Sequence, residues 1–343
     1  MKQALFNFRL FRRSDATQNL VIFTLAFGIT VIVTRFFLFL TDYPTIGGDV
    51  LHIAHVLWGG LAMGAALLLA GIYAGKDLAK LVSLIGGFGW GLFVDEIGKF
   101  LTVNNDYFFR PAAALIYIFM LACVLIIGIY SRRPKIDAET LVHQIFEDFQ
   151  EILKGDLDRK EKSRLMYKLR LFQRKYETSV FLPVVNKIAS FSEAFEPNKK
   201  ELNVIDRVQT VGIRLSERAL NSRKFEIAIL ALYIARTLPC VPAIVILTML
   251  IPSVTLANSY LLIILGSAIS VISVVGLIGV GRILSGNVQK GLRLIIFCEF
   301  INLGVINTLT FYFAQFITGF VTLVDTIILW QLYQRFKNSD IDE

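Results

Sequence analysis

Apolar residues gather along this chain into eight long runs, separated by short polar stretches and one long polar segment. An α-helix of about 20 residues crosses the roughly 30 Å of hydrocarbon in a bilayer. The pattern therefore predicts an all-α, polytopic membrane protein with about eight transmembrane helices in two groups of four. We expect the spans at residues 19–41, 50–74, 79–101, 111–130, 226–250, 256–281, 291–314 and 316–334.

The long polar segment lies between the two groups of spans. Residues 131–225 carry 20 Lys or Arg against 14 Asp or Glu, a net charge of +6. Apolar residues recur there at helical spacing, as in the run from Val142 to Leu153, and predict a small domain of about four helices. The expected organisation is a basic N-terminus (1–18), spans one to four (19–130), a helical domain (131–225), spans five to eight (226–334) and a tail (335–343).

The composition agrees with a protein that lives in a membrane. Only 18% of the residues are charged and the mean hydropathy is +0.63, whereas soluble chains are about one quarter charged. The net charge of +8 comes mostly from basic residues beside the spans and from the polar segment, so it does not indicate nucleic-acid binding. The expected surroundings are the lipid bilayer, and the oligomeric state is left open.

Basic residues predict the orientation of the spans. Lys and Arg cluster at the N-terminus, after spans two, four, six and eight, and rarely on the alternate connections, where Arg110 is the main exception. The positive-inside rule then places both termini and residues 131–225 in the cytoplasm. The first span has too long an apolar run for a cleavable signal peptide, so we interpret it as an uncleaved anchor.

Two common kinds of site are missing from the sequence. The three cysteines, Cys123, Cys240 and Cys298, all fall inside spans, which leaves neither a disulfide framework nor a CxxC metal site. The glycine-rich GGFGWG at 86–91 lacks the GK[ST] ending of a phosphate-binding loop. Its glycines fit close packing between helices instead.

Ionisable residues inside the second and third spans are the main candidate for a functional site. Each costs about 2.5–3.5 kcal/mol to place in a bilayer, so several at one depth suggest a purpose. The third span contains GLFVDEIGKF near its outer end, the second begins on the same side with GGDVLHIAH, and the connection to span four is also polar. The candidate ligand- or ion-binding residues are Asp49, His52, His55, Asp95, Glu96, Lys99, Asn105, Asp106 and Arg110.

Small residues predict how these two spans meet. His55 and Gly59 lie on one helical stripe of span two, and Gly87, Gly91 and Asp95 lie on one stripe of span three. Small residues let helices approach closely in a bilayer. If the two stripes face each other, the histidines of span two and Asp95 share one polar pocket below the outer interface.

Two interpretations of this pocket follow from its residue types. Asp95 and Lys99 are four residues apart, so Lys99 is the expected counter-ion of the carboxylate. His52, His55 and Asp95 also form the kind of ligand set that holds zinc, so a divalent metal ion is a possible cofactor. A purely structural network that fixes helix register is the alternative to both.

The second half of the chain carries its own isolated charges. Arg236, Glu299 and Asp325 lie in spans five, seven and eight, and with Arg35 of span one they are candidates for a polar pathway. The LPCVP stretch at 238–242 should break span five directly after Arg236, which we expect to pair with Glu299 or Asp325. Arg35 and Arg236 are also the best match between the two halves, although no repeat is demonstrated.

The function that fits these features best is a transporter or channel for a cation, a proton or another small ion. A metal-dependent intramembrane enzyme that acts on a lipid is an alternative, and so is a ligand sensor that signals through the cytoplasmic domain. An enzyme requires a pocket that opens sideways to lipid and has no path to the cytoplasm. A sensor requires a cytoplasmic domain firmly attached to the spans.

Overall fold

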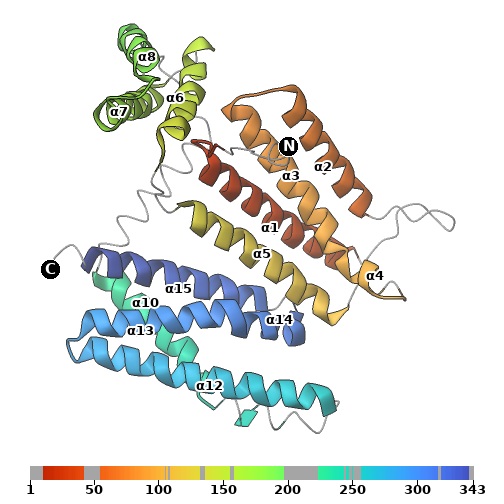
Figure 1. Ribbon diagram of the computed structural model, residues 1–343. Helices are drawn as coiled ribbons and strands as arrows, with labels where there is room; N and C mark the ends of the chain where they lie inside the picture. Colours follow the sequence, from red (N-terminus) through yellow and green to blue (C-terminus); the bar gives the residue numbers. More distant parts are fainter. Residues whose placement is uncertain are drawn as a thin grey trace, which may run out of the picture. The chain divides into compact units, whose positions relative to one another are not determined.

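The protein is all-helical in the part that the computed structural model describes, as the sequence predicted (Figure 1). The described residues are 11–41, 55–104, 106, 109–131, 136–154, 158–196, 223–242, 245–246, 249, 256–315 and 318–339. They fall into two compact units. Unit 1 lies within Met1–Ile97 and Ala122–Leu202, and unit 2 lies within Gly98–Leu121 and Asn203–Glu343.

Three long apolar helices form the membrane part of unit 1. They are α1 (Ala16–Leu40), α2 (His55–Ile72) and α3 (Lys76–Asp95), and both α1 and α2 pack along α3. The turn that joins α2 to α3 contains Gly75 at a φ of 129°. Residues that carry a side chain rarely adopt a positive φ, so glycine suits this turn. The two helices therefore run antiparallel, side by side, as a hairpin (Figure 1).

Glycines set the distances between these three helices. A methyl group on Gly59 of α2 would lie 2.6 Å from the carbonyl oxygen of Gly89 on α3, so the two backbones are in direct contact. Gly87 and Gly91 face α1 instead, where added methyl groups would collide with Phe23 and Thr30. The prediction that the Gly87 stripe faces α2 is therefore wrong. Glycines recur on two faces of α3, and only Gly89 lies on the face toward α2.

The polar segment forms a small bundle of helices, as expected. Its described helices are α6 (Ala138–Leu153), α7 (Arg159–Lys175) and α8 (Leu182–Ala194). Both α6 and α7 begin at an aspartate whose carboxylate accepts a backbone N–H, and Asp158 and Glu161 complete a capping box on α7. The fourth predicted helix lies outside the described residues. The core contains Leu141, Ile145, Leu165, Leu169, Phe172 and Val185.

This bundle is attached to the N-terminal ends of α1 and α3. The backbone N–H of Ser14 donates to Glu147 Oε2 at 2.9 Å, and Gln144 Nε2 donates to the carbonyl of Arg12 at 2.9 Å. Lys76, the first residue of α3, donates through Nζ to Asp148 Oδ1 at 2.6 Å. Helix α6 therefore holds the starts of two membrane helices through polar contacts.

Unit 2 repeats the arrangement of a single helix followed by a hairpin. α10 (Arg223–Thr237) ends in a 3₁₀ turn, η1 (Leu238–Cys240), so the predicted break at LPCVP is confirmed. α12 (Leu256–Leu284) and α13 (Val288–Ile301) then form the hairpin. The remaining helices are α4 (Ile97–Leu101), the first half of α5 (Arg110–Ser131), the π-helix η3 (Asn302–Ile306), α14 (Asn307–Ala314) and α15 (Thr318–Ser339).

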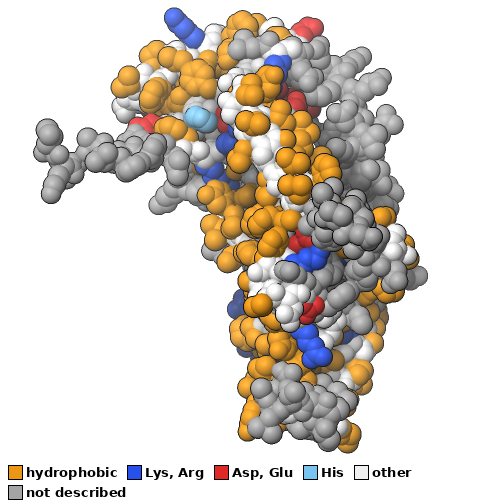
Figure 2. Space-filling view, turned by 90° about the vertical axis from the view of Figure 1, so that its right-hand side faces the viewer, with side chains coloured by type: hydrophobic (Ala, Val, Ile, Leu, Met, Phe, Trp, Pro, Cys, Tyr) orange, Lys and Arg blue, Asp and Glu red, His pale blue; other side chains and the backbone are white. Residues whose placement is uncertain are grey.

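Six described helical segments are long and apolar enough to cross a membrane. They are Ala16–Leu40, His55–Ile72, Lys76–Asp95, Arg110–Ser131, Ser259–Leu284 and Val288–Ala314, and the apolar parts of α10 and α15 are shorter. Their outer surfaces carry large exposed apolar side chains, such as Phe39 at 71% and Leu67 at 74%. Hydrophobic side chains, coloured orange, accordingly cover much of the described surface in Figure 2. Exposing an apolar surface of this kind to water is unfavourable in free energy, whereas contact with lipid chains is not. The fold is that of a multi-pass membrane protein.

Candidate functional site

Four ionisable side chains of unit 1 meet where α1, α2 and α3 come together. We call Arg35, His55, Asp95 and Glu96 the first charge cluster. Asp95 and Glu96 are fully buried, while the side chains of Arg35 and His55 are 12% and 22% exposed. Carboxylates buried in apolar helices cost several kcal/mol unless they are paired, so their partners decide what the cluster can do.

Arg35 of α1 is the cationic partner of Asp95. Its Nε donates to Asp95 Oδ1 at 2.5 Å, and its Nη2 donates to the backbone carbonyl of Asp95 at 2.8 Å. Asp95 is the last residue of α3, where carbonyls lack a partner within the helix. One guanidinium thus donates both to a carboxylate and to a carbonyl at a helix end. The planar fork of donors in arginine suits two such acceptors better than the ammonium group of a lysine.

His55 of α2 lies between the two carboxylates. Its Nε2 is 3.1 Å from Asp95 Oδ2, and its Nδ1 is 3.8 Å from Glu96 Oε1. The other oxygen of Glu96 accepts the backbone N–H of Val56 at 2.9 Å. A carboxylate is favourable at the N-terminal end of a helix, because the first N–H groups there lack helical partners and the helix dipole places partial positive charge at that end.

The four side chains carry a formal charge that one proton changes from −1 to zero. Arg35 contributes +1, and the two carboxylates contribute −1 each. A neutral imidazole can take one further proton on its second ring nitrogen. A proton on His55 would therefore bring the formal charge of these four side chains to zero, and without it they sum to −1.

Of the predicted outer site, the structure brings His55, Asp95 and Glu96 together. Lys99, Asp106 and Arg110 belong to unit 2. Asp49, His52 and Asn105 lie outside the described residues, so the predictions that concern them stay predictions. The regular four-residue spacing of Asp95 and Lys99 is interrupted, because α3 ends at Asp95 and α4 begins at Ile97.

A metal centre receives no support from the described part of the chain. No three His, Cys, Asp or Glu side chains there are arranged to hold a metal ion. Both oxygens of Asp95 are already engaged, one by Arg35 and the other by His55. The expected set of His52, His55 and Asp95 includes a residue outside the described ranges, so that hypothesis remains open.

Unit 2 contains a second charge cluster, formed by Arg236, Glu299 and Asp325. Arg236 Nη1 donates to Glu299 Oε1 at 2.9 Å, and Arg236 Nε lies 2.7 Å from Asp325 Oδ1. Asn307 Nδ2 donates to Asp325 Oδ2 at 2.9 Å. Both carboxylates are fully buried. Arg236 pairs with both of the acids that the sequence proposed as alternatives.

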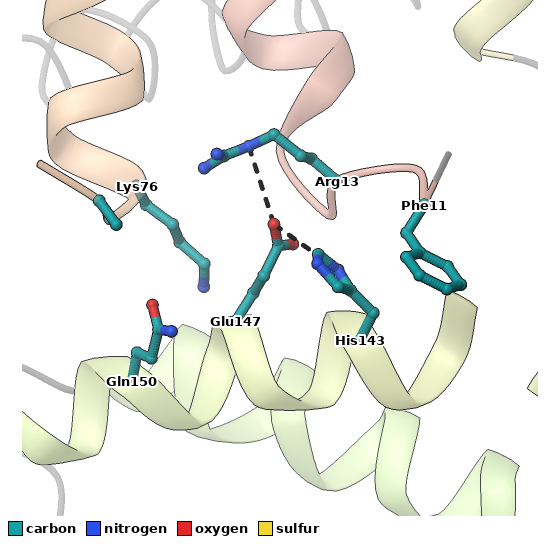
Figure 3. Close-up of a pocket in the computed structure, with 8 residues that line it drawn as sticks. Phe11, Arg13, Lys76, His143, Glu147 and Gln150 are labelled. Atoms are coloured by element: carbon teal, nitrogen blue, oxygen red, sulfur yellow. Dashed lines mark ion pairs between the residues drawn. The ribbon is translucent and has the colours of Figure 1, made fainter. Parts of the chain in front are cut away.

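A third polar site lies in unit 1 where helix α6 meets the N-terminal ends of α1 and α3. A pocket of about 330 Å³ is lined in part by Arg13, Lys76, His143 and Glu147. Figure 3 shows these four side chains around it. Burial raises the pKa of Asp15, but hydrogen bonds from Arg13 and Asn19 and the charge of Arg13 outweigh it, so this pKa lies below its usual value. The cations here already face carboxylates, so the pocket has no excess charge that would attract an ion.

Comparisons with other proteins add no assignment to these sites. No family model, no curated protein and no solved structure matches the chain. The candidate function therefore rests on the geometry of the two charge clusters.

Sequence reasoning did not identify Arg35 as the partner of Asp95. The two residues are 60 positions apart, and no spacing rule links different helices. One signal was available: Arg35 is the single Lys or Arg inside the first apolar run. A lone charge within a span needs a partner of opposite sign on a neighbouring helix.

Proposed function

We propose that this chain is an integral membrane transporter that moves protons across the bilayer. The observation that carries the proposal is the position of His55 between two fully buried carboxylates, beside Arg35. One proton neutralises these four side chains, so protonation and deprotonation change the charge of a buried site by one unit. Such a change alters the balance of pairings within the cluster, which is what coupled proton movement requires.

The proposed topology has eight spans in two groups of four, with both termini and residues 131–225 in the cytoplasm. The distribution of Lys and Arg supports this orientation, and the apolar parts of α10 and α15 supply the two spans beyond the six long ones. Single cysteines introduced at positions 45, 105 and 155 test the orientation. Labelling of position 155 from outside, or of 45 and 105 only from inside, would contradict it.

A proton-flux assay with two aspartate variants of α3 tests the function. Purified protein in vesicles is given a K⁺ gradient with valinomycin, and a trapped dye reports internal pH. Asp95→Asn removes the charge that the proton balances, so flux should fall to the level of protein-free vesicles. Asp77→Asn is the matched control, because Asp77 lies on the same helix with its side chain 62% exposed. Equal flux in Asp95→Asn and wild type would refute the proposal.

A second candidate function, ligand sensing, is favoured by one observation. Helix α3 carries Asp95 at its last residue and Lys76 at its first, and Lys76 pairs with Asp148 of the cytoplasmic bundle. A change at the first charge cluster could therefore reach α6 through one helix. The sensor would replace the transporter if vesicles showed no proton flux while an external pH change altered protease cleavage of residues 131–225.

A further inference from the structure

The second charge cluster contains one more acid than base. Arg236 contributes +1, and Glu299 and Asp325 contribute −1 each, so the three side chains sum to −1 when both acids are ionised. The two acids are fully buried, and the Arg236 side chain is 19% exposed. An uncompensated charge in such a place costs several kcal/mol, so a neutralising partner is expected.

Hydrogen bonds and ion pairs together identify which carboxylate oxygen lacks a contact. Asp325 Oδ2 accepts from Asn307 at 2.9 Å, and Asp325 Oδ1, which accepts no hydrogen bond from a described residue, lies 2.7 Å from Arg236 Nε as an ion pair. Glu299 Oε1 accepts from Arg236 at 2.9 Å and from Asn302 at 3.4 Å. Glu299 Oε2 is buried and receives no hydrogen bond from any described residue. The unbalanced charge therefore falls on one identified atom.

A proton fits this atom better than a metal cation. Metal cations in proteins take several oxygen ligands, typically six or more for Ca²⁺ and Mg²⁺. Here two of the four carboxylate oxygens accept hydrogen bonds and a third lies in an ion pair with Arg236, and no group of three metal-ligating side chains occurs in the described residues. A proton needs only one lone pair and leaves the contacts of Arg236 in place.

The order of elements around Glu299 resembles that around Asp95. In each half an arginine lies near the end of the first helix, and a hairpin follows whose turn holds a glycine at positive φ, Gly75 or Gly286. In each half the second hairpin helix carries the acid near its end. A helix irregularity, a short helix and a final long helix come next, α4 and α5 in one half and α14 and α15 in the other.

We propose that Glu299 is a second proton-binding site, protonated on Oε2 near neutral pH and held between Arg236 and Asn302 through Oε1. The proton comes from bulk water and adds to a lone pair of Oε2, and no other bond changes. Glu299 differs from the first charge cluster, where an imidazole is placed to take the proton. The inference concerns proton binding in unit 2, so it stands whether or not the chain moves protons.

Infrared spectroscopy of the purified protein in lipid films tests this assignment. A protonated carboxyl group absorbs in a region that ionised carboxylates leave empty. Wild type near neutral pH should show this band, and the band should shift when glutamate carries a ¹³C carboxyl carbon but not when aspartate does. Glu299→Gln should abolish the band. Glu96→Gln should retain it, because Glu96 is the other glutamate that is 0% exposed among the described residues.

Each outcome decides the assignment. The proposal is overturned if wild type lacks the band, if the band shifts with labelled aspartate, or if Glu96→Gln removes it. It is also overturned if folded Glu299→Gln keeps the band. If Glu299→Gln does not fold, Glu299→Asp replaces it, and the band should then shift with labelled aspartate instead of labelled glutamate. Proton flux is measured separately, so failure of the transport proposal is distinguishable from failure of this one.

Discussion

Substitution of Gly59 tests whether the close approach of α2 and α3 creates the contact between His55 and Asp95. A methyl group at Gly59 would lie 2.6 Å from the Gly89 carbonyl oxygen, whereas one at Gly60 would meet nothing within 4 Å. The two glycines are neighbours on the same helix. Gly60→Ala is therefore a matched control for Gly59→Ala, with the same chemical change and no collision.

The geometry gives the size of the effect. Ordinary contacts of a methyl carbon begin near 3.4 Å, so α2 must retreat by about 0.8 Å to accept alanine at position 59. His55 lies one helical turn earlier, and its 3.1 Å approach to Asp95 would lengthen to about 3.9 Å, beyond hydrogen-bond range. Overpacking typically costs about 1–3 kcal/mol, whereas replacing an unhindered helical glycine gains about 0.5–1 kcal/mol.

Thermal unfolding in detergent and proton flux in vesicles measure the two consequences. Gly59→Ala should be less stable than Gly60→Ala by about 1–3 kcal/mol, the cost of overpacking, because both variants share the gain from replacing a helical glycine. It should also lose flux, while Gly60→Ala should keep the flux of wild type. The reasoning is refuted if the two variants match each other in stability and in flux.

Three further predictions concern other pairings in unit 1. Arg35→Met should lower the free energy of unfolding by about 3–5 kcal/mol because it removes the guanidinium that pairs with the buried carboxylate of Asp95, and adding Asp95→Asn should restore part of that loss. Lys76→Met should make residues 131–225 more sensitive to protease, whereas Lys80→Met should not, because exposed pairs contribute only about 0–1 kcal/mol. Asp15→Asn should remove stability that wild type has above about pH 4. That stability difference should vanish as the pH falls through the lowered pKa of Asp15, and unfolding measured across acidic pH checks this.

Hydropathy alone predicted most of the membrane helices, because a long apolar helix needs no information about its neighbours. The expected spans at 19–41, 111–130 and 256–281 lie close to α1, α5 and α12. The expected span at 79–101 is interrupted: α3 ends at Asp95, and α4 continues from Ile97 to Leu101. At the break the carboxylate of Glu96 accepts the backbone N–H of Val56 on α2, a contact with another helix that hydropathy does not contain.

The candidate site was predictable only where residues share a helix or a hairpin. The meeting of His55 and Asp95 followed from matched distances along a hairpin, and the structure places them 3.1 Å apart. The arginine beside Asp95 comes from a helix outside that hairpin, so local spacing selected Lys99 instead. The glycines of α3 illustrate the same point. They lie on two faces of the helix, and the sequence does not say which face packs against α1 and which against α2.

The central claim is that the ion that crosses the membrane is the proton. A reversal potential tests the identity of the transported ion directly. Purified protein in a planar bilayer would be held under a tenfold proton gradient, with Na⁺, K⁺ and Cl⁻ equal on both sides. The account predicts a protein-dependent current that reverses near 59 mV, the value for one charge per tenfold gradient, and that is absent with Asp95→Asn. A reversal that ignores the proton gradient and follows Na⁺, K⁺ or Cl⁻, or a current unchanged by Asp95→Asn, would contradict it.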